Sequence, residues 1–316
     1  MGVYLPRMVL LLVLTFRLAL GASIGLVKRV SASDTADIGF ATGTTGGAGG
    51  STVTVTSLAA LTSAVAGSAK KTVLISGRIT GKAVVNVGSN TSILGKAGSS
   101  LEGVGLRLNK QLNVIIRNVK ISKVEASVGD ALGIQESSKV WVDHVDLSSD
   151  LDHGKDFYDG LLDVTHGCTQ VTVSNSKLSN HFKASLVGHS DSNKAEDTKI
   201  TVTYANNHWL NLNSRAPSVR FGTAHIFNNL FEKVSDGINT RVGAQVLVEN
   251  NVWKDSKKAL FSTSQGFAVL RGNDFRGASN SAPTGTFTTP PYKYSLLSTA
   301  NVASTIPRVA GQTLAF

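Results

Sequence analysis

The sequence Val202-Thr-Tyr-Ala-Asn-Asn207 returns as Ala224-His-Ile-Phe-Asn-Asn229 and again as Val246-Leu-Val-Glu-Asn-Asn251. The first asparagines of these three segments are 22 residues apart, and Asn273 follows 23 residues after Asn250. Each segment is a short β-like run that ends in asparagine. A fixed period of this length is typical of a solenoid, in which equivalent strands of successive coils stack in parallel about 4.8 Å apart.

The asparagines of this repeat have a predicted role of their own. The first asparagine of a pair shares parity with the apolar residues two and four positions earlier, as Asn228 does with Ile226 and Ala224. Side chains alternate between the two faces of a strand, so the first asparagine is predicted to point inward. Buried amides need partners, and a stack of equivalent asparagines provides them. We therefore expect a ladder of first asparagines inside the solenoid.

The composition favours strands joined by tight turns, since the chain holds 31 glycines and only 6 prolines. A leucine-rich repeat and the glycine-aspartate calcium nonapeptide are both absent, which leaves an all-β parallel β-helix. An open solenoid needs its ends covered. The apolar spacing of residues 53–65 predicts an N-terminal helical cap, and the stretch after Gly277 is interpreted as irregular covering. The glycine-rich residues 43–50 are predicted to be a loop without a nucleotide site.

Residues 1–22 have the features of a secretory signal peptide. Arg7 precedes an apolar run over residues 8–16, small residues follow at 21–23, and the run is too short for a transmembrane helix. Lys28-Arg29 is either a second, dibasic processing site or a basic pair in a leader that extends to residue 29. We expect a secreted, extracellular protein whose residues 30–316 form a single domain.

The charge of the chain indicates the kind of partner. The formal net charge is +10, and it falls to +6 without residues 1–29, which hold four basic residues and no acidic one. A basic secreted protein suits an acidic partner. No run rich in lysine and arginine with interleaved aromatics occurs, which disfavours nucleic acid. An anionic polysaccharide is the partner we expect, with no nucleic acid, no membrane and a monomeric chain.

Two further features bear on a secreted protein. Cys168 is the single cysteine, so no intrachain disulfide can form, and its neighbours Gly167 and Thr169 predict a small buried thiol. Asn90-Thr-Ser92 is a sequon for N-glycosylation, and the sequence therefore predicts a glycoprotein.

The regular period breaks between Asp130 and Arg215, where charged residues recur at wider intervals. Asp130, Asp159, Lys183 and Arg215 are separated by 29, 24 and 32 residues, each about one coil plus extra loop. Functional groups are often carried by loops on a rigid scaffold. One charged group per coil at a similar phase predicts a row along the side of the solenoid.

The acidic part of this row suits a metal. Asp159 and Asp163 would lie about 13 Å apart on a straight strand, but Gly160 between them permits a bend that brings them together. With Asp130 from the preceding coil they offer three hard oxygen ligands, which favours Ca²⁺. A neighbouring loop lacks the glycine and terminal glutamate of an EF-hand and is interpreted as solvated or structural; its acids are Asp150, Asp152 and Asp156.

The basic part of the row lies in Asn213-Ser-Arg-Ala-Pro-Ser-Val-Arg-Phe-Gly222. Arg215 and Arg220 stand five residues apart around Pro217, which stiffens the link between them. Arginines that follow Lys183 and the acids along one face are suited to an anionic substrate held partly by a metal.

Together these segments resemble polysaccharide lyase family 1, the pectate lyases, in a version like that of fungi or oomycetes. The matching motifs keep the family's order: residues 43–50, Val140-Trp-Val-Asp-His144, Tyr158-Asp-Gly-Leu-Leu-Asp163, residues 183–191 and Arg215-Ala-Pro-Ser-Val-Arg220. The resemblance implies a right-handed parallel β-helix that cleaves (1→4)-α-D-galacturonan by β-elimination and leaves 4,5-unsaturated oligogalacturonides.

The resemblance also implies roles for individual residues. Asp130, Asp159 and Asp163 match the Ca²⁺ ligands, Arg215 matches the base that takes the C5 proton, and Lys183 and Arg220 match groups that hold substrate carboxylates. Arginine is normally protonated, so its use as a base requires nearby cations to lower its pKa and predicts an alkaline optimum. Val128 stands where some members carry a second acid, which disfavours a second ion.

Three alternatives are weighed against this function. A pectin lyase acts on methylated pectin without Ca²⁺, and the aspartates at 159 and 163 disfavour it. A polygalacturonase needs paired carboxylates in Asn-Thr-Asp and Asp-Asp patterns, which are not found. A non-catalytic polysaccharide-binding β-helix would not need Arg215, Lys183 and the acids together.

Overall fold

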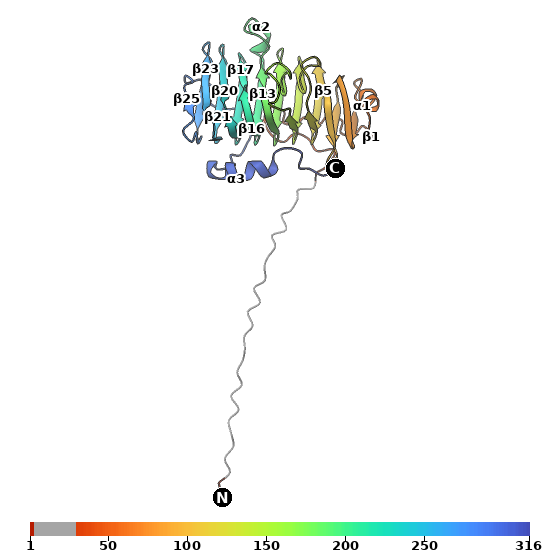
Figure 1. The fold of residues 1–316 in the computed structure, drawn as a ribbon, viewed down its shortest axis with the longest axis horizontal. Coiled ribbons are helices and arrows are strands. Elements are labelled where there is room, and N and C mark those ends of the chain that lie inside the picture. Colours follow the sequence, from red (N-terminus) through yellow and green to blue (C-terminus); the bar gives the residue numbers. More distant parts are fainter. Residues whose placement is uncertain (3–29) are drawn as a thin grey trace.

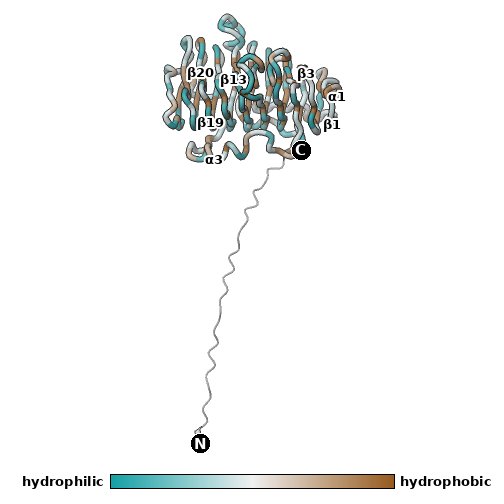
Figure 2. Tube along the Cα trace, viewed as in Figure 1, coloured by the Kyte–Doolittle hydropathy of each residue, from teal (hydrophilic) through white to brown (hydrophobic). Residues whose placement is uncertain are grey.

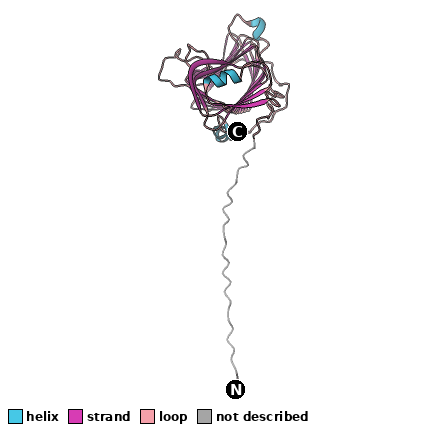
Figure 3. Ribbon diagram, turned by 90° about the vertical axis from the view of Figure 1, so that its right-hand side faces the viewer, coloured by secondary structure: helices cyan, strands magenta, loops and turns pink. Residues whose placement is uncertain are grey.

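The computed structural model describes residues 1–2 and 30–316, so most of the predicted signal peptide and the rest of the leader, including Lys28-Arg29, lie outside the described residues. In the described part, 25 strands and three helices form a parallel β-helix (Figure 1). Viewed along its axis, the solenoid is a closed outline of strands with loops projecting from its corners (Figure 3). The predicted all-β parallel β-helix is confirmed.

One strand from each coil joins a ten-stranded parallel sheet. Its strands, in spatial order, are β1 Ser51–Val55, β2 Lys71–Ile75, β4 Thr91–Gly95, β6 Leu112–Arg117, β9 Ser138–Asp143, β12 Thr169–Ser174, β15 Thr201–Ala205, β18 Thr223–Phe227, β21 Gln245–Glu249 and β24 Phe267–Arg271.

The remaining strands form a 15-stranded sheet whose two rows meet at the long strand β5. One row holds β7 Lys120–Ser122, β10 Asp146–Ser148, β13 Lys177–Lys183, β16 His208–Ser214, β19 Leu230–Val234 and β22 Val252–Lys254. The other row holds β3 Arg78–Asn86, β5 Ser100–Asn109, β8 Leu132–Gln135, β11 Leu162–Thr165, β14 Leu186–Val187, β17 Ser218–Arg220, β20 Asp236–Arg241, β23 Lys258–Thr263 and β25 Ser279–Asn280.

Strand register reproduces the sequence period. Val202 pairs with Ala224, Ala224 with Val246 and Val246 with Ala268, each step spanning 22 residues. Equivalent side chains therefore stack coil upon coil. Aromatic rings do so inside the core, where Phe231 lies 5.7 Å from Trp209 and 4.6 Å from Trp253 between ring centroids.

The asparagine ladder exists, but it is built by the second asparagine of each pair and by Asn273, which follows Gly272. The Oδ1 atoms of Asn229, Asn251 and Asn273 accept the backbone N–H of the ladder residue one coil earlier, each at 2.9 Å. The prediction that the first asparagines point inward is wrong because Asn228 and its equivalents have positive φ, 53° at Asn228. A left-handed residue breaks strand alternation, and the next residue turns inward instead.

The solenoid has an apolar interior, and a helix shorter than predicted covers its N-terminal end. Hydrophilic and hydrophobic residues are interspersed along the coils (Figure 2), and the largest cluster of buried apolar side chains runs from Val55 to Ala278. Helix α1, Leu58–Ala64, lies across the open end (Figure 3), but the predicted helix was too long because β1 occupies its first part. Cys168 is buried as predicted, and burial raises the pKa of its thiol to about 12.

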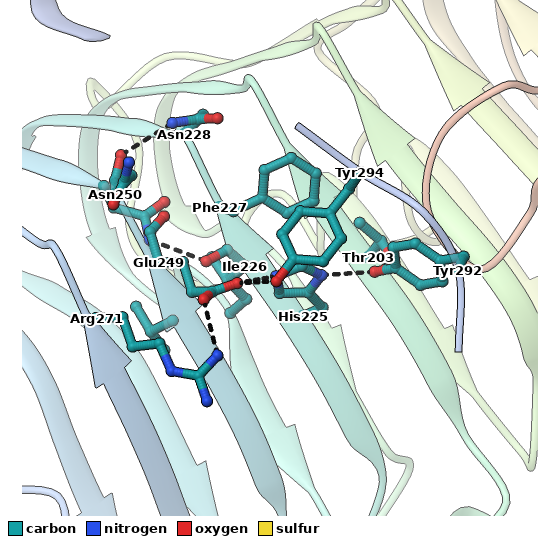
Figure 4. A network of polar contacts seen from close by, with 12 residues as sticks. Thr203, His225, Ile226, Phe227, Asn228, Glu249, Asn250, Arg271, Tyr292 and Tyr294 are labelled. Atoms are coloured by element: carbon teal, nitrogen blue, oxygen red, sulfur yellow. Dashed lines mark hydrogen bonds and ion pairs between the residues drawn. The ribbon is translucent and has the colours of Figure 1, made fainter. Parts of the chain in front are cut away.

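The C-terminal stretch is more ordered than predicted. It contains helix α3, Thr299–Val309, whose Val302 and Ile306 pack on Leu230 and Val252. Before it, Tyr292 and Tyr294 bind a buried histidine and glutamate on the ten-stranded sheet (Figure 4). The C-terminal segment from Tyr292 to the end of α3 therefore packs against the outside of the solenoid. None of the helices in the described residues is both long and apolar enough to cross a membrane.

Candidate active site

Asp130 and Asp163 converge on Gly160 from neighbouring coils. Asp130 precedes β8, Asp163 lies in β11, and these strands pair. The Gly160 N–H donates to Asp130 Oδ1 at 2.9 Å, and the Leu186 N–H donates to Asp163 Oδ1 at 2.9 Å. A Cβ at position 160 would stand 2.5 Å from Asp163 Oδ1 and 2.9 Å from Asp130 Oδ1. A side chain at position 160 would therefore have to displace these two carboxylates.

The two carboxylates are costly to ionise together. Burial, and then the charge of Asp159, raises the pKa of Asp130 to about 6. Burial and the charge of Asp130 raise the pKa of Asp163 well above its usual value. Like charges in a partly dehydrated site favour a bound cation or a proton. The pair therefore has the electrostatics of a cation site.

Asp159 lies beside this pair but contacts a lysine. Its Oδ1 is 3.4 Å from Lys183 Nζ, which also bonds Asp156 Oδ1 at 3.1 Å. The Lys183 side chain is only 9 % exposed, whereas that of Asp156 is 83 % exposed. Asp156, interpreted from sequence as solvated or structural, is therefore also an ion-pair partner of Lys183.

His181 holds the backbone of Asp159 in place through a hydrogen bond. The buried His181 Nε2 donates to the Asp159 carbonyl oxygen at 2.5 Å, and its Nδ1 lies 2.5 Å from Ser149 Oγ. Burial lowers the pKa of His181 to about 4, so the ring is neutral at ordinary pH. Sequence reasoning missed this contact because a histidine next to a strand carries no distinguishing pattern.

Arg215 lies within electrostatic range of the acidic pair. It adopts a positive φ of 58° between β16 and β17, and its charge lowers the pKa values of both Asp130 and Asp163. Among the described residues, no side-chain hydrogen bond or ion pair holds its guanidinium. Arg215 is thus a cation near the carboxylates that is available to a ligand.

Arg220 belongs to a second cationic group one coil further along. Its Nε donates to Asp191 Oδ1 at 2.5 Å and its Nη1 to the Gly188 carbonyl at 3.2 Å. Arg241, its register partner on β20, bonds both oxygens of Asp191 at 3.1 Å. Burial and the charge of Arg220 lower the pKa of Arg241. Sequence reasoning missed Arg241, although it follows Arg220 by about one period.

Backbone pairing aligns these residues as predicted. The N–H of Ala131 bonds the Gly160 carbonyl, that of Leu161 bonds Ala184, and that of Ser185 bonds Arg215. The positions just before β8, β11, β14 and β17 therefore lie in one row. Along that row, carboxylates come first and cations follow.

The donor set fits a hard cation, although it is not closed around one. In the part of the chain that the structure describes, no three His, Cys, Asp or Glu side chains are gathered tightly enough to hold a metal ion. Asp130 and Asp163 converge, while Asp159 is turned toward Lys183. Carboxylate oxygens are what Ca²⁺ prefers, and burial together with the neighbouring carboxylates raises the pKa of both Asp130 and Asp163, so a cation bound there would favour their ionised form.

Fold and site together define a class: a parallel β-helix whose flank presents carboxylates for a cation beside cations for an acidic ligand. The profile of the family "Pectate lyase" matches residues 13–314. The chain is 57 % identical over 295 residues to pectate lyase B of Colletotrichum gloeosporioides, covering 92 % of this chain and 89 % of that one. It is 59 % identical to pectate lyase A of Emericella nidulans, covering 92 % and 90 %.

Solved structures agree with the sequence comparison. A pectate lyase from Bacillus sp. N165, in complex with trigalacturonate, superposes with a TM-score of 0.80 at 32 % identity and covers 87 % of this chain and 98 % of that one. Pectate lyase II of Xanthomonas campestris superposes with a TM-score of 0.78 at 27 % identity, covering 89 % and 100 %. The chain belongs to the pectate lyase family.

Proposed function

We propose that this chain cleaves polygalacturonate by Ca²⁺-assisted β-elimination. The observation that carries the proposal is the pair of the half-buried Asp130 and the buried Asp163 on the flank of a pectate lyase fold, with Arg215 near enough to lower the pKa of both. The trigalacturonate in the Bacillus complex supports the choice of substrate.

In this proposal the acidic residues hold the cation. Asp130, Asp159 and Asp163 would bind Ca²⁺ once Asp159 releases Lys183. Bound Ca²⁺ would neutralise a uronate carboxylate and make the proton on the adjacent C5 more acidic. Lys183, freed from Asp159, then binds a substrate carboxylate, as does Arg220 when the sugar replaces Asp191.

The chemistry requires one base. Arg215 accepts the C5 proton, a double bond forms between C4 and C5, and the C4–O bond breaks with its electron pair leaving on oxygen. The leaving oxygen takes a proton and becomes the new hydroxyl end of the other fragment. Cationic side chains stabilise the enolate-like charge that develops on the carboxylate.

The first experiment is to incubate purified protein with polygalacturonate, with and without EDTA, and to follow unsaturated product by ultraviolet absorbance. We expect unsaturated product that disappears with chelation and returns with added Ca²⁺. Activity that survives EDTA would refute the calcium assignment, and new reducing ends without unsaturation would indicate a hydrolase. Arg215→Lys with an unchanged rate would refute the proposed base.

We also propose that the enzyme acts outside the cell as a monomer, because the sequence begins with a signal-like segment and its curated relatives are fungal pectate lyases. Expression of the full chain in a fungal host, followed by activity measurement in medium and cell extract, tests export. Light scattering on the purified protein tests the monomer. Activity confined to the cell extract would contradict export.

A further inference from the structure

Arg107 lies one coil before the acidic pair, on the same face of the sheet. It stands in β5 between Leu106 and Leu108, which are both fully buried in the core. Side chains alternate across a strand, so the Arg107 side chain points outward. Asp163 likewise stands between two core residues of β11, and backbone pairing joins Arg107 to Gly133 and Gly133 to Asp163. Arg107 and Asp163 therefore belong to one outward-facing line of residues across three neighbouring strands.

The guanidinium of Arg107 reaches the turn that carries Asp130. A Cβ added at Gly129, the residue before Asp130, would stand 3.1 Å from Arg107 Nη2. Burial and the charge of Asp159 raise the pKa of Asp130, whereas Arg107 is one of the charges that lower it. Gly133 contributes no side chain to the line between Arg107 and Asp163. This cation therefore stands directly beside the carboxylates.

Arg107 is not held by a carboxylate of its own. Its side chain is half-buried, and within residues 30–316 no side-chain hydrogen bond or ion pair fixes its guanidinium. By contrast, Arg220 and Arg241 both bind Asp191. Arg215 is free in the same sense as Arg107 and lies on the other side of the acidic pair along the solenoid axis. Positive charge that is available to a ligand thus brackets the carboxylates on both sides.

We propose that Arg107 binds a uronate carboxylate of the polysaccharide on the N-terminal side of the cation site. This role rests on the proposed function, because it requires an acidic polymer that crosses Asp130 and Asp163. Strands β5, β8, β11, β14 and β17 are successive neighbours, so β5 and β17 lie about 19 Å apart along the solenoid (Figure 1). A chain of linked uronates that runs from Arg220 across the cation site therefore meets Arg107 next.

A guanidinium beside Asp130 could instead serve only as its counter-charge, and the two roles differ in what can be measured. Removal of a counter-charge strengthens Ca²⁺ binding and leaves the affinity for polysaccharide unchanged. Removal of a carboxylate-binding group weakens polysaccharide binding even when Ca²⁺ is saturating. Arg107 is in either case too far along the row to replace Arg215 as the base, so its loss should change affinity and not the chemical step.

The first test measures polysaccharide binding separately from turnover. Arg107→Gln and Arg107→Lys are each made in an Arg215→Lys background, and migration is followed by affinity electrophoresis in gels of increasing polygalacturonate content at saturating Ca²⁺. We expect Arg107→Gln to weaken binding about tenfold or more, as for the loss of a hydrogen bond between charged groups, and Arg107→Lys to lose less. Arg78→Gln is the control, since this exposed arginine of β3 already pairs with Glu102, and it should bind like its parent.

The second test is calorimetric titration of Ca²⁺ into the same variants without polysaccharide. Arg107→Gln should bind Ca²⁺ at least as tightly as its parent, because a positive charge near Asp130 has been removed. Unchanged polysaccharide binding in Arg107→Gln would overturn the proposal. So would a loss of Ca²⁺ affinity as large as the loss of polysaccharide affinity, since Arg107 would then act through the cation site. A wild type that binds polygalacturonate but forms no unsaturated product would refute the proposed function alone, because the comparison of binding does not depend on cleavage.

Discussion

The carboxylates of Asp130 and Asp163 meet across the Cα of Gly160, where an added methyl group would stand under 3.0 Å from an oxygen of each. Gly160→Ala must therefore push the carboxylates apart, a rearrangement that costs about 1–3 kcal/mol in a well-packed site. We expect about a tenfold or greater loss of Ca²⁺ affinity and of kcat/KM at subsaturating Ca²⁺. Isothermal titration and rate measurements across Ca²⁺ concentrations check this.

A matched control for that variant is Gly154→Ala. Gly154 lies in the adjacent loop, and a Cβ there would meet no atom within 4 Å. Its Ca²⁺ affinity and rate should stay near those of the wild type. Equal behaviour of the two variants would show that crowding of the carboxylates does not control Ca²⁺ binding.

Arg241 should bind substrate one coil beyond Arg220, because both guanidiniums are held by the single carboxylate of Asp191. Hydrogen bonds to charged groups contribute about 1.5–3 kcal/mol. Arg241→Gln is expected to raise KM for long polygalacturonate about tenfold or more with little change in kcat, since the interaction is made equally in ground and transition states. Arg276→Gln, at an exposed arginine paired with Asp274, should not change KM. A fall in kcat alone would contradict this role.

The spacing of the sequence predicted the coil because a solenoid converts a sequence period directly into strand register. The same spacing could not place side chains where the backbone leaves the regular strand. The left-handed residues, such as Asn228, shifted the ladder to Asn229. Helix α3 was missed because it lies outside the repeat and has Pro307 inside it.

In the candidate site, too, the spacing of residues predicted their positions along the solenoid but not their side-chain contacts. The order of Asp130, Asp159, Lys183 and Arg215 in one row followed from one charged residue per coil. Asp159 contacts Lys183 and not the other carboxylates. This contact depends on the orientation of the side chain, which the spacing of residues in the sequence does not determine. The roles assigned to these residues remain predictions.

The second asparagines should carry a large share of local stability. Asn229 accepts the Asn207 N–H and donates to the Tyr204 and Phe227 carbonyls and to Asn251 Oδ1. Asn229→Ala leaves several of these fully buried groups without partners, at a cost of about 3 kcal/mol. Denaturant unfolding should show this loss, whereas the exposed Asn213→Ala should cost below about 0.5 kcal/mol. Similar losses in both variants would contradict the ladder's role.

His225, which contacts Tyr292 of the C-terminal segment, should make the free energy of unfolding depend on pH. Its Nε2 donates to Glu249 at 2.9 Å, and its Nδ1 lies 2.7 Å from the Tyr292 hydroxyl, which bonds Thr203 (Figure 4). Burial lowers the pKa of His225 to about 4 in spite of Glu249, against an ordinary value of 6.5. Between these values the unfolded chain binds a proton that the folded protein does not.

The free energy of unfolding should therefore fall as pH drops from 6.5 to 4, by about 1.4 kcal/mol per pH unit for this one group. His181 and His208, whose pKa values are also lowered by burial, add to the same slope. His225→Gln should reduce the slope by about one proton, while His153→Gln, at an exposed loop histidine, should preserve it. Urea unfolding measured at intervals from pH 4 to 7 gives both slopes, and an unchanged slope in His225→Gln would show that this histidine is charged in the folded protein.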